Sequence, residues 1–273
     1  MPLRPAKPCW PEPSQRDERS LYTCTLGTGP DVVLIHGWGM HSGVWEVVAE
    51  SLLEHYRITV VDLPGHGFSR LLQTGHDLQG LSAAVAAAVP TPAIWVGWSL
   101  GGLVAQWVAI TAPERVTRLA LVNSTPCFVR RPDWPHGIDL PVLRRFAEEL
   151  RLDHRAVLKR FIALEVHGSE HATVQLHALK AMLFQHGEPA VSALEDGLTI
   201  LETTDLRPDW SRIVCPTLLL MGQRDQLVPA KAGAALVVRL PHARLRVFER
   251  AGHAPFFSHP LDFVSELRSI FDA

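Results

Sequence analysis

The sequence AIWVGWSLGG at residues 93–102 decides the fold more than any other stretch of the chain. It joins a short apolar run, typical of a buried strand, to a Gly-x-Ser-x-Gly motif centred on Ser99, and a helical pattern follows at once. Strand, motif and helix in this order predict a tight turn that exposes the Ser99 hydroxyl above the end of a sheet. Gly97 and Gly101 supply the room that such a turn needs. Ser99 is therefore the candidate nucleophile.

Similar apolar runs alternate with helical patterns on both sides of this motif, as expected for a parallel sheet covered by helices on both faces. We predict strands at residues 32–35, 57–62, 93–97, 117–122, 217–221 and 244–248. We predict helices between them at residues 43–55, 77–89, 100–111, 230–240 and 261–271. The predicted fold class is α/β, with a mostly parallel sheet and flanking helices.

The alternation stops between residues 124 and 213, where the sequence shows helical periodicity and no convincing buried strand. We predict an inserted helical cap, or lid, at 124–213, a core formed by 21–123 and 214–273, and a disordered or loosely attached leader at 1–20. An insertion of this kind covers the carboxyl edge of the sheet, where α/β proteins hold their sites. Packing helices without a functional part are the alternative.

A serine hydroxyl needs a base to remove its proton and an acid to orient that base. Asp225 follows the predicted strand at 217–221, and His253 follows the strand at 244–248. Both lie on loops at the sheet edge that also holds Ser99, in the chain order Ser, Asp, His. We therefore predict a catalytic triad of Ser99, Asp225 and His253.

Other acids and histidines fit these roles less well. Asp205 and Asp209 end the helical block rather than a strand, and Glu249 lies too close in sequence to His253. The remaining histidines that adjoin motifs are interpreted as structural, with His259 capping the following helix. These are His36, His66 and His259.

Acyl transfer also needs donors for the oxyanion that forms, and backbone amides are their usual source. One donor is expected at Leu100, directly after the nucleophile. The other is expected at Trp38, in the glycine loop HGWG at residues 36–39, with the Trp38 and Trp98 side chains beside the acyl pocket. Packing in the core is the alternative for both tryptophans. The sequence has no phosphate-binding loop and no clustered metal ligands, so we predict neither a cofactor nor a metal.

The composition excludes several classes of protein. The chain has 273 residues, with 26 Lys and Arg against 28 Asp and Glu, a net charge of -2. This balance gives no support to bulk binding of nucleic acid. No run approaches the roughly 18 to 20 apolar residues of a membrane span, and the first twenty residues lack the apolar stretch of a signal peptide. Four cysteines without a CxxC pair are typical of a reducing compartment. We predict a cytoplasmic monomer.

Five motifs together resemble the α/β-hydrolase superfamily, and further segments resemble more narrowly the pimeloyl-[acyl-carrier protein] methyl ester esterases of biotin synthesis. The five are HGWG (36–39), DLPGHGFS (62–69), GWSLGG (97–102), GQRDQLVP (222–229) and GHAPFFSHP (252–260). The further segments are STPCF (124–128), DWP (133–135) and TDLR (204–207). The narrower likeness also rests on HGWG, on Trp98 beside Ser99, and on HAPF (253–256) with SHP (258–260). The likeness runs from about residue 21 to the C-terminus.

This resemblance implies a carboxylesterase that hydrolyses the methyl ester of a pimeloyl chain on acyl-carrier protein. It implies the same triad, with Trp38, Ser99, Leu100 and His253 in contact with the substrate. It also implies that a cap segment lines the substrate channel, formed here by Phe161, Ile162, Ala163, Leu164 and Glu165. Arg160 matches a basic residue that meets the acidic carrier protein, whereas Thr173 and His177 stand where arginines are expected.

The region from Arg130 to Arg160 holds eight basic and five acidic residues, an excess that favours an acidic partner. Arg155 and Lys159 join Arg160 as predicted carrier contacts, while a solvated helix face is the alternative. A general short-acyl carboxylesterase and a carbon–carbon bond hydrolase would use the same triad. A binding protein or sensor of the same fold is the third possibility.

Overall fold

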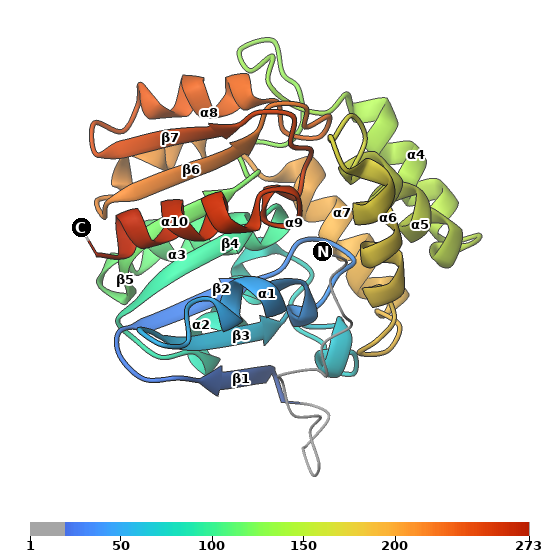
Figure 1. Cartoon of the computed structure of the whole chain (residues 1–273). Helices are drawn as coiled ribbons and strands as arrows, with labels where there is room; N and C mark the ends of the chain where they lie inside the picture. Colours follow the sequence, from blue (N-terminus) through green and yellow to red (C-terminus); the bar gives the residue numbers. More distant parts are fainter. Residues whose placement is uncertain (1–19, 273) are drawn as a thin grey trace.

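Seven strands form a single sheet at the centre of the computed structural model, which describes residues 20–272 (Figure 1). The strands lie in the order β1-β3-β2-β4-β5-β6-β7, and β1 pairs antiparallel with β3 while all other pairs are parallel. Their bounds are β1 Tyr22–Leu26, β2 Asp31–Ile35, β3 Arg57–Asp62, β4 Ala93–Trp98, β5 Val116–Val122, β6 Thr217–Gly222 and β7 Ala243–Phe248. The predicted mostly parallel sheet is confirmed.

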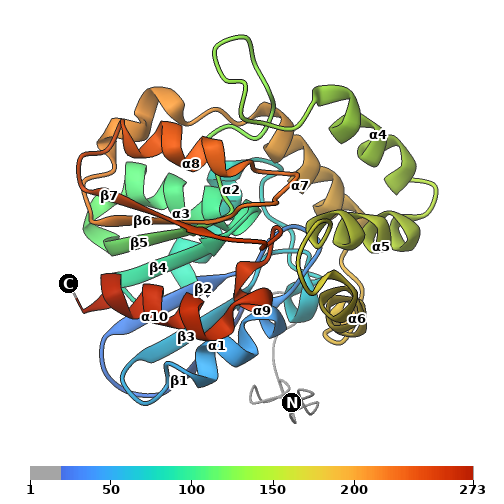
Figure 2. The same ribbon diagram turned by 45° about the horizontal axis from the view of Figure 1, so that its top comes forward.

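Helices cover both faces of this sheet (Figure 2). One face carries α1 (Glu46–Glu50), α9 (Pro255–Ser258) and α10 (Pro260–Phe271), and the other carries α2 (Leu78–Ala88), α3 (Leu100–Thr111) and α8 (Ala230–Val237). Single 3₁₀ turns lie at Ser42–Trp45, Gly67–Ser69 and Pro113–Arg115, and a longer one at Arg207–Arg212. Two covered faces explain why the inner strands read as continuous apolar runs rather than alternating ones.

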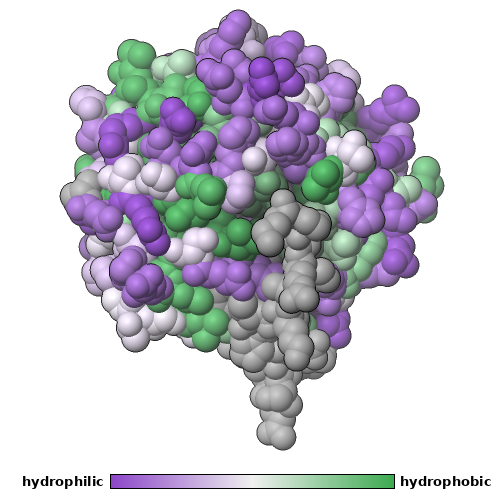
Figure 3. All heavy atoms as spheres, viewed as in Figure 1, coloured by the Kyte–Doolittle hydropathy of each residue, from purple (hydrophilic) through white to green (hydrophobic). Residues whose placement is uncertain are grey.

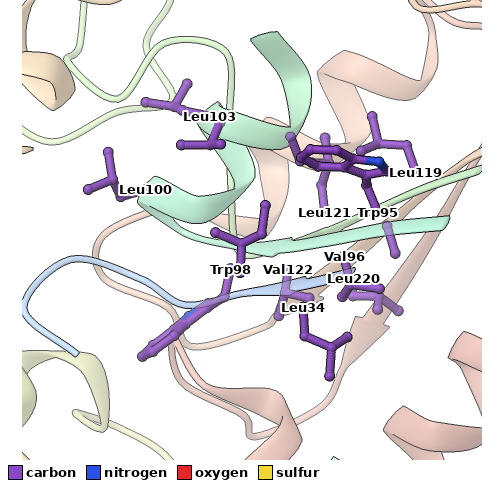
Figure 4. Packing of buried hydrophobic residues seen from close by; sticks show 14 of the residues in the cluster. Leu34, Trp95, Val96, Trp98, Leu100, Leu103, Leu119, Leu121, Val122 and Leu220 are labelled. Carbon is purple, nitrogen blue, oxygen red and sulfur yellow. The ribbon is translucent and has the colours of Figure 1, made fainter. Parts of the chain in front are cut away.

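Strand β4 lies at the middle of the core. All six of its residues are buried, as are all six of β6. The side chains labelled in Figure 4 stand on both sides of β4, with Trp95 near α3 and Leu34 of β2 on the opposite side. Each large apolar side chain buried in this way contributes about 1.5–3 kcal/mol. The core therefore holds β4 rigidly, and with it the turn that follows.

Four helices separate β5 from β6: α4 (Leu140–Leu150), α5 (His154–Glu165), α6 (Ala172–Met182) and α7 (Val191–Thr203). We call residues 124–213 the helical insertion; its helices gather at one side of the sheet (Figure 1). Two hydrogen bonds tie α7 and its N-cap to the loops after β2 and β3. The Trp38 indole donates to the Leu194 carbonyl at 2.9 Å, and the Ala190 amide donates to the Gly65 carbonyl at 2.7 Å. The insertion thus packs on the carboxyl ends of these strands.

Three local expectations differ from the structure. Strand β1 was not predicted, because it is a half-exposed edge strand without a continuous apolar run. The helix expected at 43–55 is a 3₁₀ turn followed by α1, which ends at Glu50. His259 does not cap α10 with its side chain, since its Nδ1 instead bonds to the Ser258 hydroxyl at 2.7 Å. Among residues 20–272, no helix has both the length and the apolar character needed to cross a bilayer.

Candidate active site

Ser99 occupies the turn between β4 and α3 in a strained backbone conformation, with φ 54° and ψ -117°. A non-glycine residue in such a conformation costs on the order of 1–3 kcal/mol, so its surroundings must compensate. The Ser99 amide donates to the Val122 carbonyl of β5 at 3.0 Å, and its carbonyl accepts from the Gly102 amide at 2.9 Å. A methyl group on Gly101 would lie 2.5 Å from the His36 carbonyl oxygen, which shows why this turn needs glycine. The predicted tight turn is present.

Asp225 and His253 are in direct contact at the ends of β6 and β7. Their Oδ2 and Nδ1 atoms lie 2.7 Å apart, and both side chains are buried. The other carboxylate oxygen of Asp225 accepts from the amides of Leu227 and Val228 at 2.7 and 3.1 Å. Burial alone would lower the pKa of His253, but the charge and hydrogen bond of Asp225, with a further contribution from Glu165, raise it. The carboxylate therefore orients the imidazole and favours its charged form.

The opposite nitrogen of His253, Nε2, has no hydrogen-bond partner among the described residues and is buried. No hydrogen bond joins it to Ser99. Of the predicted triad, the structure therefore brings Asp225 and His253 into contact but shows no bond between His253 and Ser99. Trp98, directly before Ser99, donates through its indole N–H to the His253 carbonyl at 2.8 Å, and the two rings lie 5.7 Å apart. His253 is thus anchored to the strand that carries Ser99.

The loop after β2 lies against Ser99, as expected for an oxyanion-hole loop. A methyl group on Gly37 would lie 3.2 Å from the Ser99 Cβ. The side chains of the two predicted donors, Trp38 and Leu100, meet at Gly197 of α7, where a methyl group would lie 2.5 Å from Trp38 Cδ1 and 3.4 Å from Leu100 Cδ2. Because Leu100 is the first residue of α3, its amide has no carbonyl partner inside the helix. It lies at the N-terminus of α3, which is the positive end of the helix dipole.

Asn123 was missed by the sequence reasoning, although it aligns two loops of the site, those that carry Asp225 and His253. It follows β5 with φ 40°, a conformation that asparagine tolerates better than most residues. Its side chain donates to the Gly252 carbonyl at 3.0 Å and accepts from the Gly222 amide at 2.7 Å. The loops that carry His253 and Asp225 are therefore both fixed to the end of β5. A lone Asn directly after a strand was the available signal.

The five residues predicted to line the substrate channel end helix α5. Phe161 packs edge-on against Trp38 at 4.7 Å, and Phe161 and Ile162 are buried while Ala163 and Leu164 are half-buried. Glu165 is 1% exposed, and neither of its carboxylate oxygens has a hydrogen-bond partner within residues 20–272. Burial raises the pKa of Glu165 to about 8. This end of α5 therefore meets the loop after β2 through Phe161 and presents an unpaired carboxyl group.

A cavity of about 270 Å³ lies between α7 and the loop after β3. Apolar side chains form much of its wall, among them Leu63, Leu81, Leu100 and Ile200. Of the predicted site residues, Leu100 lines it and the others do not. Trp98 is fully buried and packs on Phe256 at a ring distance of 5.1 Å, so it supports His253 from the core rather than facing this cavity.

Comparison with known proteins shows the family of this chain. Residues 32–267 match the alpha/beta hydrolase family. The chain belongs to the alpha/beta hydrolase family.

Its relatives include proteins named pimeloyl-[acyl-carrier protein] methyl ester esterase, which confirms the narrower resemblance. The protein of that name from Xanthomonas campestris pv. campestris (strain B100) is 47% identical to this hydrolase over 239 residues, covering 88% of this chain and 94% of the relative. The one from Nitrosomonas europaea is 45% identical over 246 residues, covering 90% and 97%.

Solved structures show the same fold as the hydrolase. An esterase from Exiguobacterium antarcticum has 25% identity and a TM-score of 0.83, with 93% of this chain and 96% of that chain covered. A bromoperoxidase from Bacillus anthracis, 22% identical, also has a TM-score of 0.83, covering 93% and 95%, which shows the fold alone.

Three of the residues that compete with the predicted triad make structural contacts. Asp205 accepts two bonds from the Arg207 guanidinium, the closer at 2.7 Å. His36 Nε2 accepts from the Leu63 amide at 2.9 Å, which fixes the loop after β3. His66 Nε2 accepts from the Gly39 amide at 3.4 Å. These histidines therefore hold the loops after β2 and β3 together, as interpreted from the sequence.

The excess of basic residues between Arg130 and Arg160 is neutralised in part by acidic residues from other segments of the hydrolase. Three arginines of this region, Arg144, Arg151 and Arg155, form ion pairs at 2.6–3.0 Å with glutamates that lie further along the chain. Those partners are Glu202, Glu195 and Glu188. Arg160 pairs with Glu149, while Lys159 is exposed and has no ion pair with a described residue. Figure 3 shows mixed polar and apolar residues at the right edge, where α4–α6 lie.

A second buried polar cluster joins the insertion to the core of the hydrolase. His186 lies between the rings of His41 and Phe68, at 3.9 and 4.2 Å, with its Nδ1 3.4 Å from Asp62 Oδ2. His41, Asp62 and His186 have the composition of a metal site, and their ligand atoms lie within 4.8 Å of one another. Both nitrogens of His41 already have hydrogen-bond partners, the Gly43 amide and the Met182 carbonyl. The cluster is thus suited to hydrogen bonding between insertion and core.

Proposed function

We propose that the chain is a serine carboxylesterase that hydrolyses the methyl ester of pimeloyl-[acyl-carrier protein] in biotin synthesis. The observation that carries the proposal is the identity of 47% over 88% of the chain to a relative of that name, together with the paired Asp225 and His253 beside the strained Ser99.

In the proposed mechanism, His253 takes the Ser99 proton through Nε2 as the serine oxygen attacks the ester carbonyl. Asp225 holds the imidazole by its Nδ1 and stabilises the imidazolium that forms. The amides of Leu100 and Trp38 donate to the oxyanion, each contributing about 3 kcal/mol to the transition state. His253 returns the proton to the methoxy oxygen, so methanol leaves and an acyl-enzyme remains.

Water then attacks the acyl-enzyme by the same route. His253 accepts a proton from water, a second oxyanion forms in the same place, and the proton passes back to Ser99 as the acid leaves. The net reaction consumes one ester and one water and gives one carboxylic acid and one methanol. All of these steps use protein groups at the carboxyl edge of the sheet.

The helical insertion, residues 124–213, is proposed to act as a cap on the core formed by 21–123 and 214–273. Ser99 is 3% exposed and His253 is fully buried, so the substrate must enter between insertion and core. Lys159, Arg155 and Arg160 stay predicted carrier contacts. A cytoplasmic location and a monomeric state also stay predictions, and the predicted leader, residues 1–20, lies outside the described residues except for Ser20.

A general short-acyl carboxylesterase is the second candidate. It is favoured by the ion pairs of Arg144, Arg151 and Arg155, because they leave fewer free cations for an acidic carrier protein. Comparing turnover of carrier-bound pimeloyl methyl ester with turnover of free short methyl esters separates the two. A large preference for the carrier-bound ester supports the first candidate.

The Ser99→Ala substitution tests the proposed chemistry. It removes the nucleophile and leaves the backbone intact, so ester hydrolysis is expected to fall by about 10⁶-fold, the size of effect that loss of a serine nucleophile has elsewhere. Purified protein is assayed for methanol release from carrier-bound pimeloyl methyl ester, and circular dichroism checks the fold. Growth of a biotin-requiring strain that lacks its esterase, rescued by the wild-type chain but not by the variant, is the matching cellular result. Wild-type turnover in Ser99→Ala would exclude this mechanism.

A further inference from the structure

The end of β5 and the residues after it hold the main chain of Ser99 on both sides. The Ser99 amide donates to the Val122 carbonyl at 3.0 Å, and the Ser99 carbonyl accepts from the Ser124 hydroxyl at 2.8 Å. Amides in the first turn of α3 donate to the same carbonyl, from Gly102 at 2.9 Å and from Leu103 at 3.3 Å. The Ser124 hydroxyl therefore adds a side-chain bond to a carbonyl that the helix already uses.

Ser124 is itself fixed by a residue of α3. The side-chain nitrogen of Gln106 donates to the Ser124 hydroxyl at 3.1 Å and to the Gly102 carbonyl at 3.0 Å. Because a carbonyl only accepts, the atom that faces Gly102 must be the nitrogen of the Gln106 amide. That nitrogen only donates, so the Ser124 oxygen accepts from it, and the single hydroxyl hydrogen of Ser124 is directed to the Ser99 carbonyl. A methyl group on Gly102 would overlap the Ser124 hydroxyl, which shows how closely α3 packs here.

Gln106 places an unpaired polar atom in the core. Its side chain is fully buried, and its carbonyl oxygen has no hydrogen-bond partner within residues 20–272. A buried acceptor without a partner carries a desolvation cost. Packing alone therefore does not account for a glutamine at this position, whereas both of its N–H groups bond to the turn that carries Ser99.

The bonds to the Ser99 carbonyl also set the direction of the Leu100 amide. The Ser99 carbonyl and the Leu100 N–H belong to one trans peptide unit, which is planar and in which the two groups point in opposite directions. Leu100 is 1% exposed, and its N–H makes no main-chain hydrogen bond with a described residue. With its carbonyl partner held by Ser124, this N–H points out of the N-terminus of α3.

We propose that Ser124 is a positioning residue that, together with Gln106, aims and strengthens the Leu100 amide as an oxyanion donor. Hydrogen bonds run in one direction from the Gln106 amide through the Ser124 hydroxyl and the Ser99 carbonyl to the Leu100 N–H. In a buried chain of this kind each bond polarises the next. Both side chains act through the main chain on a donor that matters most when the oxyanion is charged, so they lower the barrier without tightening ester binding. The inference rests on the proposed esterase mechanism, because it concerns a donor of that mechanism.

The Ser124→Ala substitution removes the hydroxyl from this chain of bonds. We expect kcat for p-nitrophenyl butyrate to fall about three- to tenfold with KM unchanged, less than the roughly 10²–10³-fold loss that follows removal of a donor. Hexyl trifluoromethyl ketone gives a second measurement: the Ser99 oxygen adds to its carbonyl carbon, the serine proton passes to His253, and the ketone oxygen becomes the oxyanion. The inhibition constant of this ketone should rise by a factor similar to the loss of kcat.

Matched variants separate this effect from a general loss of packing. Ser82→Ala removes another buried hydroxyl, one without a hydrogen-bond partner in the described part of the chain, and should keep the wild-type kcat and ketone affinity. Gln106→Met keeps the length of the side chain but removes both N–H groups, so a loss of kcat of about two- to threefold is expected. Because the two residues act through one chain of bonds, the double variant should lose no more kcat than Ser124→Ala alone.

Ketone affinity defines the outcomes. A folded Ser124→Ala protein that binds the ketone as tightly as the wild type overturns the inference, whatever its melting temperature, and leaves the esterase proposal standing. If Ser124→Ala does not fold by circular dichroism, Gln106→Met takes its place, and wild-type ketone affinity in that variant overturns the inference in the same way. Absence of ester turnover in the wild type counts against the esterase proposal instead, and calorimetric titration with the ketone then tests Ser124 by itself.

Discussion

At the scale of single residues, the site depends on groups that are held by bonds to the main chain. Ser99 keeps its positive φ because β5 and the first turn of α3 bond to its amide and carbonyl. Asp225 is fixed by two amides, and His253 is fixed on two sides, by the Asp225 carboxylate and by the Trp98 indole. Little reorganisation is then needed when the reaction begins, which is what efficient electrostatic catalysis requires.

Asp225→Asn tests the orienting role of the carboxylate. The amide of asparagine keeps the size of the group but removes its charge and can hold His253 in the wrong tautomer. We expect kcat to fall by about 10⁴-fold, as in other triads, with the melting temperature little changed. Asp262→Asn, on the exposed start of α10, is the control and should keep full activity. An Asp225→Asn enzyme within tenfold of wild type would show that Asp225 does not orient the base.

At the scale of secondary structure, helix α7 supports the loop after β2, which carries Trp38. The Trp38 indole bonds to the Leu194 carbonyl on this helix, and its ring lies flush against Gly197. Glycine inside a helix costs about 1 kcal/mol relative to alanine, so its presence here reflects the space that Trp38 needs. The insertion therefore shapes the site through helix packing as well as through the residues at the end of α5.

The Gly197→Ala substitution would raise the helix propensity of α7 but crowd the Trp38 ring. Alanine adds about 1 kcal/mol of helix propensity, but its methyl group would lie 2.5 Å from Trp38 Cδ1, and overpacking of this kind typically costs about 1–3 kcal/mol. We expect a net loss of stability and, because the loop that carries Trp38 must shift, at least about a tenfold loss of kcat. Thr199→Ala, exposed on the same helix, gains propensity without the clash and should be as active as wild type. Chemical denaturation measures the stability of the two variants, and ester turnover measures their kcat. A Gly197→Ala protein as stable and as active as Thr199→Ala would contradict the prediction.

At the scale of the whole molecule, buried titratable groups make folding sensitive to pH. Burial, the largest cause, lowers the pKa of His36 to about 3 and of His41 to about 4, and it also lowers the pKa of His66. Their unfolded pKa is near 6.5, so between about pH 4 and 6.5 the unfolded chain binds more protons and stability is lost as pH falls. Glu165 acts in the opposite direction: its raised pKa gives stability that is present below pH 4.5 and is lost as pH rises to about 8.

Stability should therefore be greatest near roughly pH 6.5 and decline on both sides. Thermal unfolding from pH 4.5 to 8.5 measures this curve. His41→Asn, which keeps an acceptor for the Gly43 amide, should flatten the acid side, and Glu165→Gln should flatten the alkaline side. His55→Asn, on an exposed residue, should change neither. A curve that rises steadily with pH to 8.5 would contradict the role assigned to Glu165.

The sequence by itself determined the sheet, the strained turn and the order of the catalytic candidates. Buried parallel strands must be continuous apolar runs, and a nucleophile turn must carry small residues around its serine, so both leave local marks that can be read. Asp225 and His253 could be predicted because each directly follows a strand end, and parallel strands bring those ends to one edge. Edge strand β1 left no such mark, because only Tyr22 of its five residues is buried.

Only the tertiary structure decided the environment of these groups. The pairing of three arginines of the insertion with glutamates further along the chain, the bridging role of Asn123, and the meeting of Trp38 with Gly197 all join residues that are far apart in sequence. The same holds for Glu165, whose place at the end of a helix says nothing of its burial beside His253. Charge, burial and close packing depend on which segments meet in space, and local sequence patterns do not record that.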